Sequence, residues 1–328
     1  MSIIFADGEL TTGLNAGTTW ANAFQGAAGL QSACDAAVAG DTLYVTRTFT
    51  LAAKIDIDTA SGTESAPIRI IGHNYNSGDP IIDGTYAVLD ANSVATSAVE
   101  GNNEDFWIWE NVEFKNATTT NVYAVAECDY WTFVNCSSHH AGRGGVSGSG
   151  WGPNGLEDWD HPVFVLCKSY SNLENGFRPN NCVFFGCRSY SNGGHGFCAV
   201  GSLFNNCIAY LNAGSGFYLQ GDNQKITNSV SDRNTAAGIY LGGSPEQIVA
   251  CRITNNNIGL QGDGSALGFG CYNFLKGNTI EEQDCTIISY LKGKNTRITT
   301  GDDGYTDVSS GDYSLMASAV ARRIEMQI

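Results

Sequence analysis

The sequence has few positive charges and no long apolar stretch. Its 17 lysines and arginines stand against 33 aspartates and glutamates, a formal net charge of −16. This acidity argues against a nucleic-acid-binding surface, and it would repel an anionic polysaccharide unless a cation or a local basic patch intervened. No stretch reaches transmembrane length, so we expect no membrane association. The start, MSIIFADGELTTG, lacks the features of a signal peptide, which predicts synthesis and folding in a cytosol.

Disulfides are also unexpected. The chain has 11 cysteines, an odd number, in 328 residues, whereas disulfide frameworks are typical of small secreted domains. The positions of the cysteines say more than their number. Residues 187 to 197 read CRSYSNGGHGF, and twenty residues earlier the chain reads CKSYSNLENGF. The cysteine therefore belongs to a repeat.

Besides a glycine, three kinds of residue recur at fixed positions of the repeat, and we call each such set of equivalent positions a column. Its anchors, 20 to 22 residues apart from Cys167 onward, are Cys136, Cys167, Cys187, Cys207, Ser229 and Cys251, with a fainter copy at Asn111. An asparagine follows five residues after all but the Cys136 anchor: Asn116, Asn172, Asn192, Asn212, Asn234 and Asn256. An apolar residue precedes each anchor by three: Ile108, Phe133, Phe164, Phe184, Phe204, Ile226 and Ile248. A short period with apolar strands and polar turns predicts a β solenoid.

The pattern resembles the right-handed parallel β-helix of the pectate-lyase-like superfamily, over roughly residues 40 to 300. That resemblance implies an all-β chain. Residues 26–39, GAAGLQSACDAAVA, read as a short amphipathic helix that would cap the first coil. The expected organisation is an N-terminal cap over 1–42, β-helix coils over 43–300 and a closing segment over 301–328.

Equivalent residues of such a stack lie about 4.8 Å apart, so each column becomes a ladder. The cysteine column is expected to be buried and reduced, because parallel Cβ atoms do not suit disulfide geometry. The asparagines are expected to bond from coil to coil. Gly194, His195 and Gly196 match a Gly-His-Gly motif of polygalacturonases, but no aspartate pair accompanies it in residues 172 to 181. We therefore interpret His195 as a tolerant turn residue.

Between Cys136 and Cys167 the spacing stretches, which indicates an inserted loop at about 139–162. Inserted loops on a β-helix often carry function. The candidate carbohydrate-binding residues are His139, Arg143, Trp151 and Trp159, and the candidate catalytic carboxylates are Glu157 and Asp160. Trp159, Asp160 and His161 resemble a Trp-Ile-Asp-His motif of pectate lyases, although the accompanying arginine motif is missing. The alternative is a glycine-rich loop with solvated charges. No metal or cofactor is expected.

Positions flanking the apolar column should point outward, yet they are apolar for about five coils. This outward apolar stripe is a candidate oligomer interface, with Trp107, Trp109, Val163, Val165, Val183 and Phe185 as its residues. The alternative is that the inserted loop folds over it.

Two functions follow as expectations. The first is a structural virion-surface protein of a tailed phage, a homotrimeric capsid decoration protein or short spike, with capsid or tail proteins as partners and assembly in the host cytoplasm. It is favoured by the absent signal peptide, the reduced cysteines and the apolar stripe, and it would not be an enzyme. The alternative is a polysaccharide lyase or glycoside hydrolase acting on a surface or cell-wall polysaccharide. The fold alone does not decide between them.

Overall fold

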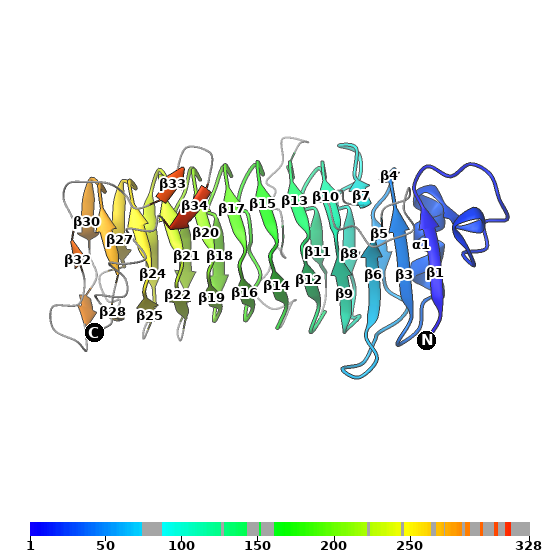
Figure 1. Ribbon diagram of the computed structural model, residues 1–328, viewed down its shortest axis with the longest axis horizontal. Helices are drawn as coiled ribbons and strands as arrows, with labels where there is room; N and C mark the ends of the chain where they lie inside the picture. The colour runs from blue at the N-terminus through cyan, green and yellow to red at the C-terminus, as the bar shows by residue number, and fades with distance from the viewer. Residues whose placement is uncertain are drawn as a thin grey trace.

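A computed structural model gives the fold of the chain. The residues it describes are 1–73, 87–125, 128–142, 151, 161–221, 224–243, 246–263, 267–271, 273–283, 286–288, 296–297, 305–307 and 312–315. Figure 1 shows these residues as a long stack of coils with the N-terminus at one end. Nearly every strand pairs in parallel with the strand one coil away, so the predicted parallel β-helix is confirmed.

Three parallel sheets form the walls of the stack. Among the described residues, sheet A has 13 strands: β2 (Phe24–Gln25), β1 (Ile3–Asp7), β3 (Thr42–Thr46), β6 (Ile68–Gly72), β9 (Trp107–Glu110), β12 (Thr132–Val134), β14 (Val163–Val165), β16 (Val183–Phe185), β19 (Leu203–Asn205), β22 (Lys225–Thr227), β25 (Glu246–Val249), β28 (Leu267–Cys271) and β31 (Thr286–Ile288). Sheet B has 11: β4 (Thr48–Thr50), β7 (Ala87–Asp90), β10 (Val112–Lys115), β13 (Ser137–His139), β15 (Lys168–Tyr170), β17 (Arg188–Tyr190), β20 (Ile208–Tyr210), β23 (Val230–Asp232), β26 (Arg252–Thr254), β29 (Phe274–Lys276) and β32 (Thr296–Arg297).

Sheet C has two parts. The first holds β5 (Ile55–Ile57), β8 (Val99–Gly101) and β11 (Val122–Ala124), and the second holds β18 (Phe197–Val200), β21 (Phe217–Gln220), β24 (Ala237–Gly242), β27 (Ile258–Gly262) and β30 (Ile280–Gln283). Isolated bridges from Val122 to Trp151, and from Trp151 through Phe177 to Phe197, join the two parts. Trp151 therefore supplies one rung of sheet C inside the inserted segment.

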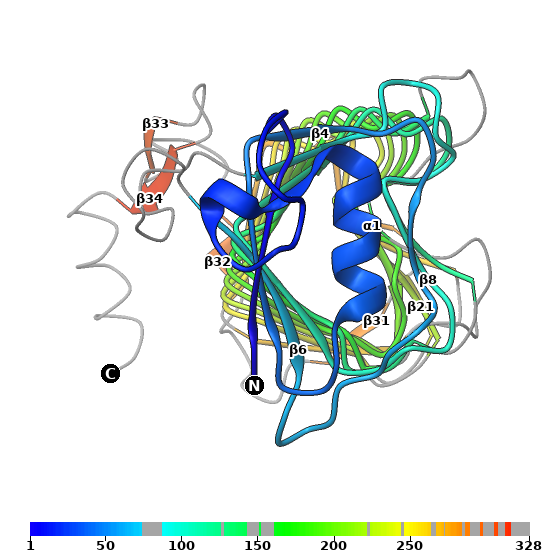
Figure 2. The same ribbon diagram turned by 90° about the vertical axis from the view of Figure 1, so that its right-hand side faces the viewer.

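Helix α1 (Gly26–Ala36) lies across the N-terminal end of the stack, as Figure 2 shows. It buries Leu30, Ala33 and Cys34 against the first coil. Gln31 holds it there, because its side chain exchanges two hydrogen bonds with the backbone of Asp56. The predicted capping helix is confirmed, and it covers an apolar cross-section that would otherwise be open to water. A 3-10 turn, η1 (Trp20–Asn22), precedes it, and an antiparallel hairpin, β33 (Tyr305–Asp307) and β34 (Asp312–Leu315), lies beside the stack.

Aromatic rings fill the middle coils. One column stacks Phe133, Phe164, Phe184 and Phe204, with successive ring centroids 5.2, 5.0 and 4.9 Å apart. A second column from sheet C stacks Trp151, Phe177, Phe197 and Phe217 at 5.9, 5.0 and 5.0 Å. The two columns meet edge to face, as between Phe184 and Phe197. Both arrangements are favourable for aromatic pairs and fix the register of the coils.

The cysteine column is buried as expected, and every cysteine whose side chain is described is free. Each thiol contacts a backbone carbonyl of the preceding coil. Cys167 Sγ lies 3.3 Å from the carbonyl oxygen of Phe133, and Cys187 Sγ lies 3.3 Å from that of Phe164. The thiols therefore pack as small apolar groups that also donate a weak hydrogen bond.

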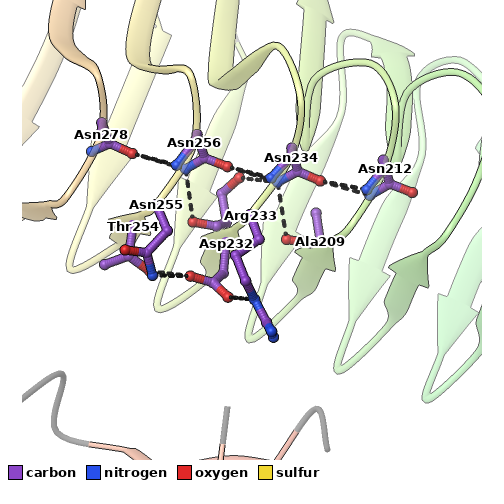
Figure 3. Close-up of polar contacts among 10 residues, drawn as sticks. Ala209, Asn212, Asp232, Arg233, Asn234, Thr254, Asn255, Asn256 and Asn278 are labelled. Atoms are coloured by element: carbon purple, nitrogen blue, oxygen red, sulfur yellow. Dashed lines mark hydrogen bonds and ion pairs between the residues drawn. The ribbon is translucent and has the colours of Figure 1, made fainter. Parts of the chain in front are cut away.

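The asparagine ladder is confirmed from Asn172 onward. Each amide donates from Nδ2 to Oδ1 of the next asparagine, at 2.9 Å between Asn192 and Asn212. Figure 3 shows the continuation to Asn278. The same Oδ1 atoms also accept the backbone N–H of the preceding asparagine, so buried donors at this turn are satisfied by a neighbouring coil.

The register at β9 corrects the sequence interpretation. Trp109 pairs with Phe133 and Ile108 with Thr132, so Trp109, not Ile108, belongs to the inward column. Trp107 and Trp109 are fully buried, and neither belongs to an outward stripe. The faint anchor at Asn111 was one residue out, because Asn111 occupies the corner with φ 56°, as Asn135 does with φ 49°. A slip of one residue turns every side chain of a strand to the other face.

The same slip of one residue explains why Asn116 does not lie on the asparagine ladder, where the sequence pattern placed it. Its Nδ2 donates to Asp90 at 2.8 Å instead. Asn121 serves this coil, donating to Ser138 Oγ and to the carbonyl of His139.

Candidate functional site

The inserted segment is described in part. Arg143, Glu157, Trp159 and Asp160 lie outside the described residues. His139, His140 and Trp151 are described, and they lie where the segment leaves sheet B and touches sheet C.

Trp151 is not a sugar platform. Its side chain is fully buried, parallel to Phe177 with ring centroids 5.9 Å apart and edge-on to Phe133 at 4.7 Å. The indole takes the place that phenylalanine holds in the next coils. The prediction that Trp151 binds carbohydrate is therefore wrong, because a short inward rung interrupts what looked like one continuous surface loop.

His139, also predicted to bind carbohydrate, ends β13 on the outer face of sheet B. Its Nε2 lies 3.2 Å from Glu113 Oε1, and its Nδ1 is in hydrogen-bonding contact with Nδ1 of His140. Its ring stacks on Tyr170 at 4.5 Å, which holds the imidazole parallel to the tyrosine. His139 is 8% exposed, so these contacts fix its orientation.

Two further charged groups complete this acid–base cluster, which we define as Asp90, Glu113, Lys115, His139 and His140. Lys115 Nζ lies 3.3 Å from Glu113 Oε1 and 3.9 Å from Asp90 Oδ2. Glu113 and Lys115 come from β10, one coil before His139, and Asp90 comes from β7, two coils before it.

Electrostatics keep Glu113 ionised. Burial alone would raise the pKa of Glu113, but the hydrogen bond and charge of His139, together with Lys115, hold that pKa below its ordinary value. A carboxylate acceptor at His139 Nε2 favours the ring tautomer that carries its proton on that nitrogen. The cluster thus joins an anionic acceptor, an imidazole pair and a cation, which are groups that can take up and return a proton.

The sequence interpretation found His139 but missed Asp90, Glu113 and Lys115. They alternate with the buried residues Leu89, Val112 and Phe114 along their strands, which is typical of any solvated strand face. A usable signal is their register: Glu113 and Lys115 pair with Ser137 and His139, so the three polar groups share neighbouring rungs.

His195 lies on another face. Its Nδ1 accepts the backbone N–H of Ser215 at 2.9 Å, its own N–H donates to Asn175 Oδ1 at 2.8 Å, and its ring stacks on Tyr218 at 4.2 Å. Burial lowers the pKa of His195 to about 4. These contacts hold a neutral ring that links three coils, which supports a structural interpretation of His195 and makes the position less tolerant than expected.

The outward apolar stripe persists after the loss of its tryptophans. Val183 and Phe185 are 41% and 49% exposed, whereas Val163 and Val165 are half-buried. Leu203 of the next strand is exposed too. These side chains point outward as predicted, and their role as an interface stays a prediction.

Across the described ranges, no three histidine, cysteine or acidic side chains are placed to hold a metal ion. The helices described here include none with the length and apolarity to cross a bilayer.

No protein-family model and no curated protein sequence matches the chain. Solved structures do resemble it. The crystal structure of pectate lyase Pel9A matches with a TM-score of 0.75 at 19% identity, covering 97% of this chain and 90% of that one. An alginate lyase from Paenibacillus sp. str. FPU-7 matches with a TM-score of 0.62 at 14% identity, over 87% of this chain and 99% of that one. A rhamnogalacturonan lyase matches with a TM-score of 0.52 at 14% identity, over 98% of both chains. The chain therefore has the pectate-lyase-like parallel β-helix fold.

Proposed function

We propose that the chain acts on a polysaccharide, as a lyase or a glycoside hydrolase, with the acid–base cluster as its reactive groups. The observation that carries this proposal is the contact of Glu113 with both His139 and Lys115, at 3.2 and 3.3 Å. The cluster lies at the start of the inserted segment, on a fold similar to three polysaccharide lyases. The similarity of fold supports a polysaccharide as the substrate, and the cluster supports acid–base chemistry on it.

The two reactions need different parts of the cluster. A lyase removes the proton next to a uronate carboxylate and expels the glycosidic oxygen, so it needs a base and a cation that offsets the carboxylate charge. The His139–His140 pair and Lys115 supply these groups. A hydrolase needs two carboxyl groups, for which Asp90 and Glu113 are available on either side of Lys115.

The experiment is an activity screen on polygalacturonate, alginate, rhamnogalacturonan and neutral dextran. Elimination creates a carbon–carbon double bond, detected by ultraviolet absorbance, together with a new reducing end; hydrolysis creates the reducing end alone. Glu113→Gln should lower the rate by about 100-fold or more, because it replaces the anionic acceptor at His139 Nε2 with a neutral amide and so removes the charge that holds a proton on that nitrogen. The exposed Glu64→Gln is the matched control and should leave the rate unchanged. Turnover that survives Glu113→Gln would remove this cluster from the mechanism.

A virion-surface role is the second candidate. The exposed part of the outward stripe, Val183, Phe185 and Leu203, favours it, since such a patch is typical of an assembly surface. The three similar structures named above are enzymes and lend it no support. Copurification of the native chain with virus particles would favour this second function.

A further inference from the structure

Two cations lie side by side on the outer face of sheet B. Lys168 on β15 and Arg188 on β17 are register partners, one rung apart, and Arg188 is exposed. Neither forms an ion pair with any residue that the structure describes. Two acidic side chains described on this face are engaged elsewhere, Glu113 by Lys115 and His139 and Asp232 by Arg233.

This arrangement is costly without an anion. Like charges directly opposite one another on neighbouring strands repel, and a parallel stack spaces their backbones at about 4.8 Å. The chain has 33 acidic residues against 17 basic ones, yet none of the described acids pairs with either cation. An anionic group bound from solution would offset both charges, and Arg188 can hold a carboxylate or sulfate through two parallel N–H donors.

A rigid aromatic column runs beside the cations. Tyr170 and Tyr190 project from the same two strands, and Tyr210 extends the column, with successive ring centroids 4.9 Å apart and ring planes within 10°. His139 stacks on the other side of Tyr170. Tyr170 and Tyr190 each have a stacked ring on both faces, so only the edges of these two rings can line the surface. Nucleic-acid bases stack on open ring faces, which Tyr170 and Tyr190 do not offer.

We propose that the outer face of β15 and β17 binds an anionic polysaccharide, with Lys168 and Arg188 receiving its carboxylate or sulfate groups. Two cations one rung apart suit a polymer with about one charge per sugar, running along the stack. A nucleic acid carries a far denser charge and would be repelled by the rest of a chain of net charge −16. The binding surface adjoins the acid–base cluster through Tyr170, but binding does not depend on that cluster's being catalytic.

The test is the affinity of the full chain for four probes: polygalacturonate, dextran sulfate, neutral dextran and single-stranded DNA. We expect binding to one or both anionic polysaccharides that weakens with salt, and none to dextran. Arg188→Glu should weaken it about tenfold or more, and Arg188→Gln by less, because the first change adds repulsion to the lost hydrogen bonds. The control is Lys225→Glu, an equal charge change at an exposed outward position of sheet A, which should have little effect.

The two polysaccharide arms identify the anion, carboxylate or sulfate, and either result upholds the proposal. Equal losses in Arg188→Glu and Lys225→Glu would overturn it, as would binding to dextran as tight as to the charged polymers. DNA binding as tight as polysaccharide binding would overturn the ligand class. If Arg188-dependent binding persists while no polysaccharide is cleaved, this inference stands and the proposed enzymatic function fails.

Discussion

Nδ2 of Asn192 donates to Oδ1 of Asn212 at 2.9 Å, and its own Oδ1 accepts Nδ2 of Asn172 at the same distance. Each asparagine thus accepts a hydrogen bond from the coil before it and donates one to the coil after it. Because the side chains are buried, an interruption leaves polar groups without partners on both sides.

Asn192→Ala should therefore destabilise the fold by about 2 to 4 kcal/mol, since the backbone N–H of Asn172 and its amide both lose their acceptor. Asn192→Asp should cost more, because it places a buried carboxylate against Asn212 Oδ1. Urea unfolding measures both, with the exposed Asn205→Ala as the control expected to change stability by less than about 0.5 kcal/mol. Equal effects at Asn192 and Asn205 would mean that the ladder contributes nothing.

The ladders were the part of the fold that the sequence could predict. A buried asparagine must recur from coil to coil to keep its neighbour hydrogen-bonded, so the ladder is visible in the sequence as a repeated asparagine. The cysteine position recurs because each coil offers the same confined inward site, which also accepts Ser229. The coil at β9 was misplaced for a physical reason: the corner also favours asparagine, because Asn111 adopts φ 56°, and this corner residue looked like an anchor. Because Trp107, Ile108 and Trp109 are all apolar, the alternation of polar and apolar residues could not show which side chains of this strand point inward.

The candidate site was harder to predict. Glu113 and His139 belong to different coils, and nothing in a solvated strand face requires either residue to recur. Trp151 was misjudged because its rung is a single bridged residue, too short to show any period.

Trp151 gives a prediction that separates packing from binding. Trp151→Ala should cost about 3 to 5 kcal/mol, since it removes a buried ring between Phe133 and Phe177. Trp151→Phe should cost about 1 kcal/mol or less, because phenylalanine continues the column and removes an indole N–H that has no hydrogen-bond partner among the residues the structure describes. Thermal unfolding gives the stabilities, and polysaccharide affinity of the Phe variant should equal that of the wild type. A loss of affinity in a stable Phe variant would return Trp151 to the binding site.

His195 should make stability depend on pH. Its folded pKa, about 4, lies below the ordinary value of 6.5, so the unfolded chain binds the proton more readily. The contribution of the neutral ring is thus complete above about pH 6.5 and is lost as the pH falls toward 4, by at most about 1.4 kcal/mol per pH unit. His195→Asn should flatten this part of the curve, whereas the exposed His161→Asn should not. Urea midpoints at several pH values provide the comparison, and parallel curves for wild type and His195→Asn would show that the ring titrates normally.

The homotrimer stays a prediction, now resting on fewer residues. With Trp107 and Trp109 inside, the exposed apolar surface of sheet A consists of Val183, Phe185 and Leu203, flanked by the half-buried Val163 and Val165. Three copies around a common axis would bury this surface at about 25 cal/mol per Å² of apolar area. Val183→Asp with Phe185→Lys should yield monomers, because charges buried without partners oppose association. Light scattering at micromolar concentration measures the mass, with Arg188→Glu on the outer face of sheet B as the control. A wild-type chain that is monomeric there rules out the trimer and leaves the stripe to be explained by another partner.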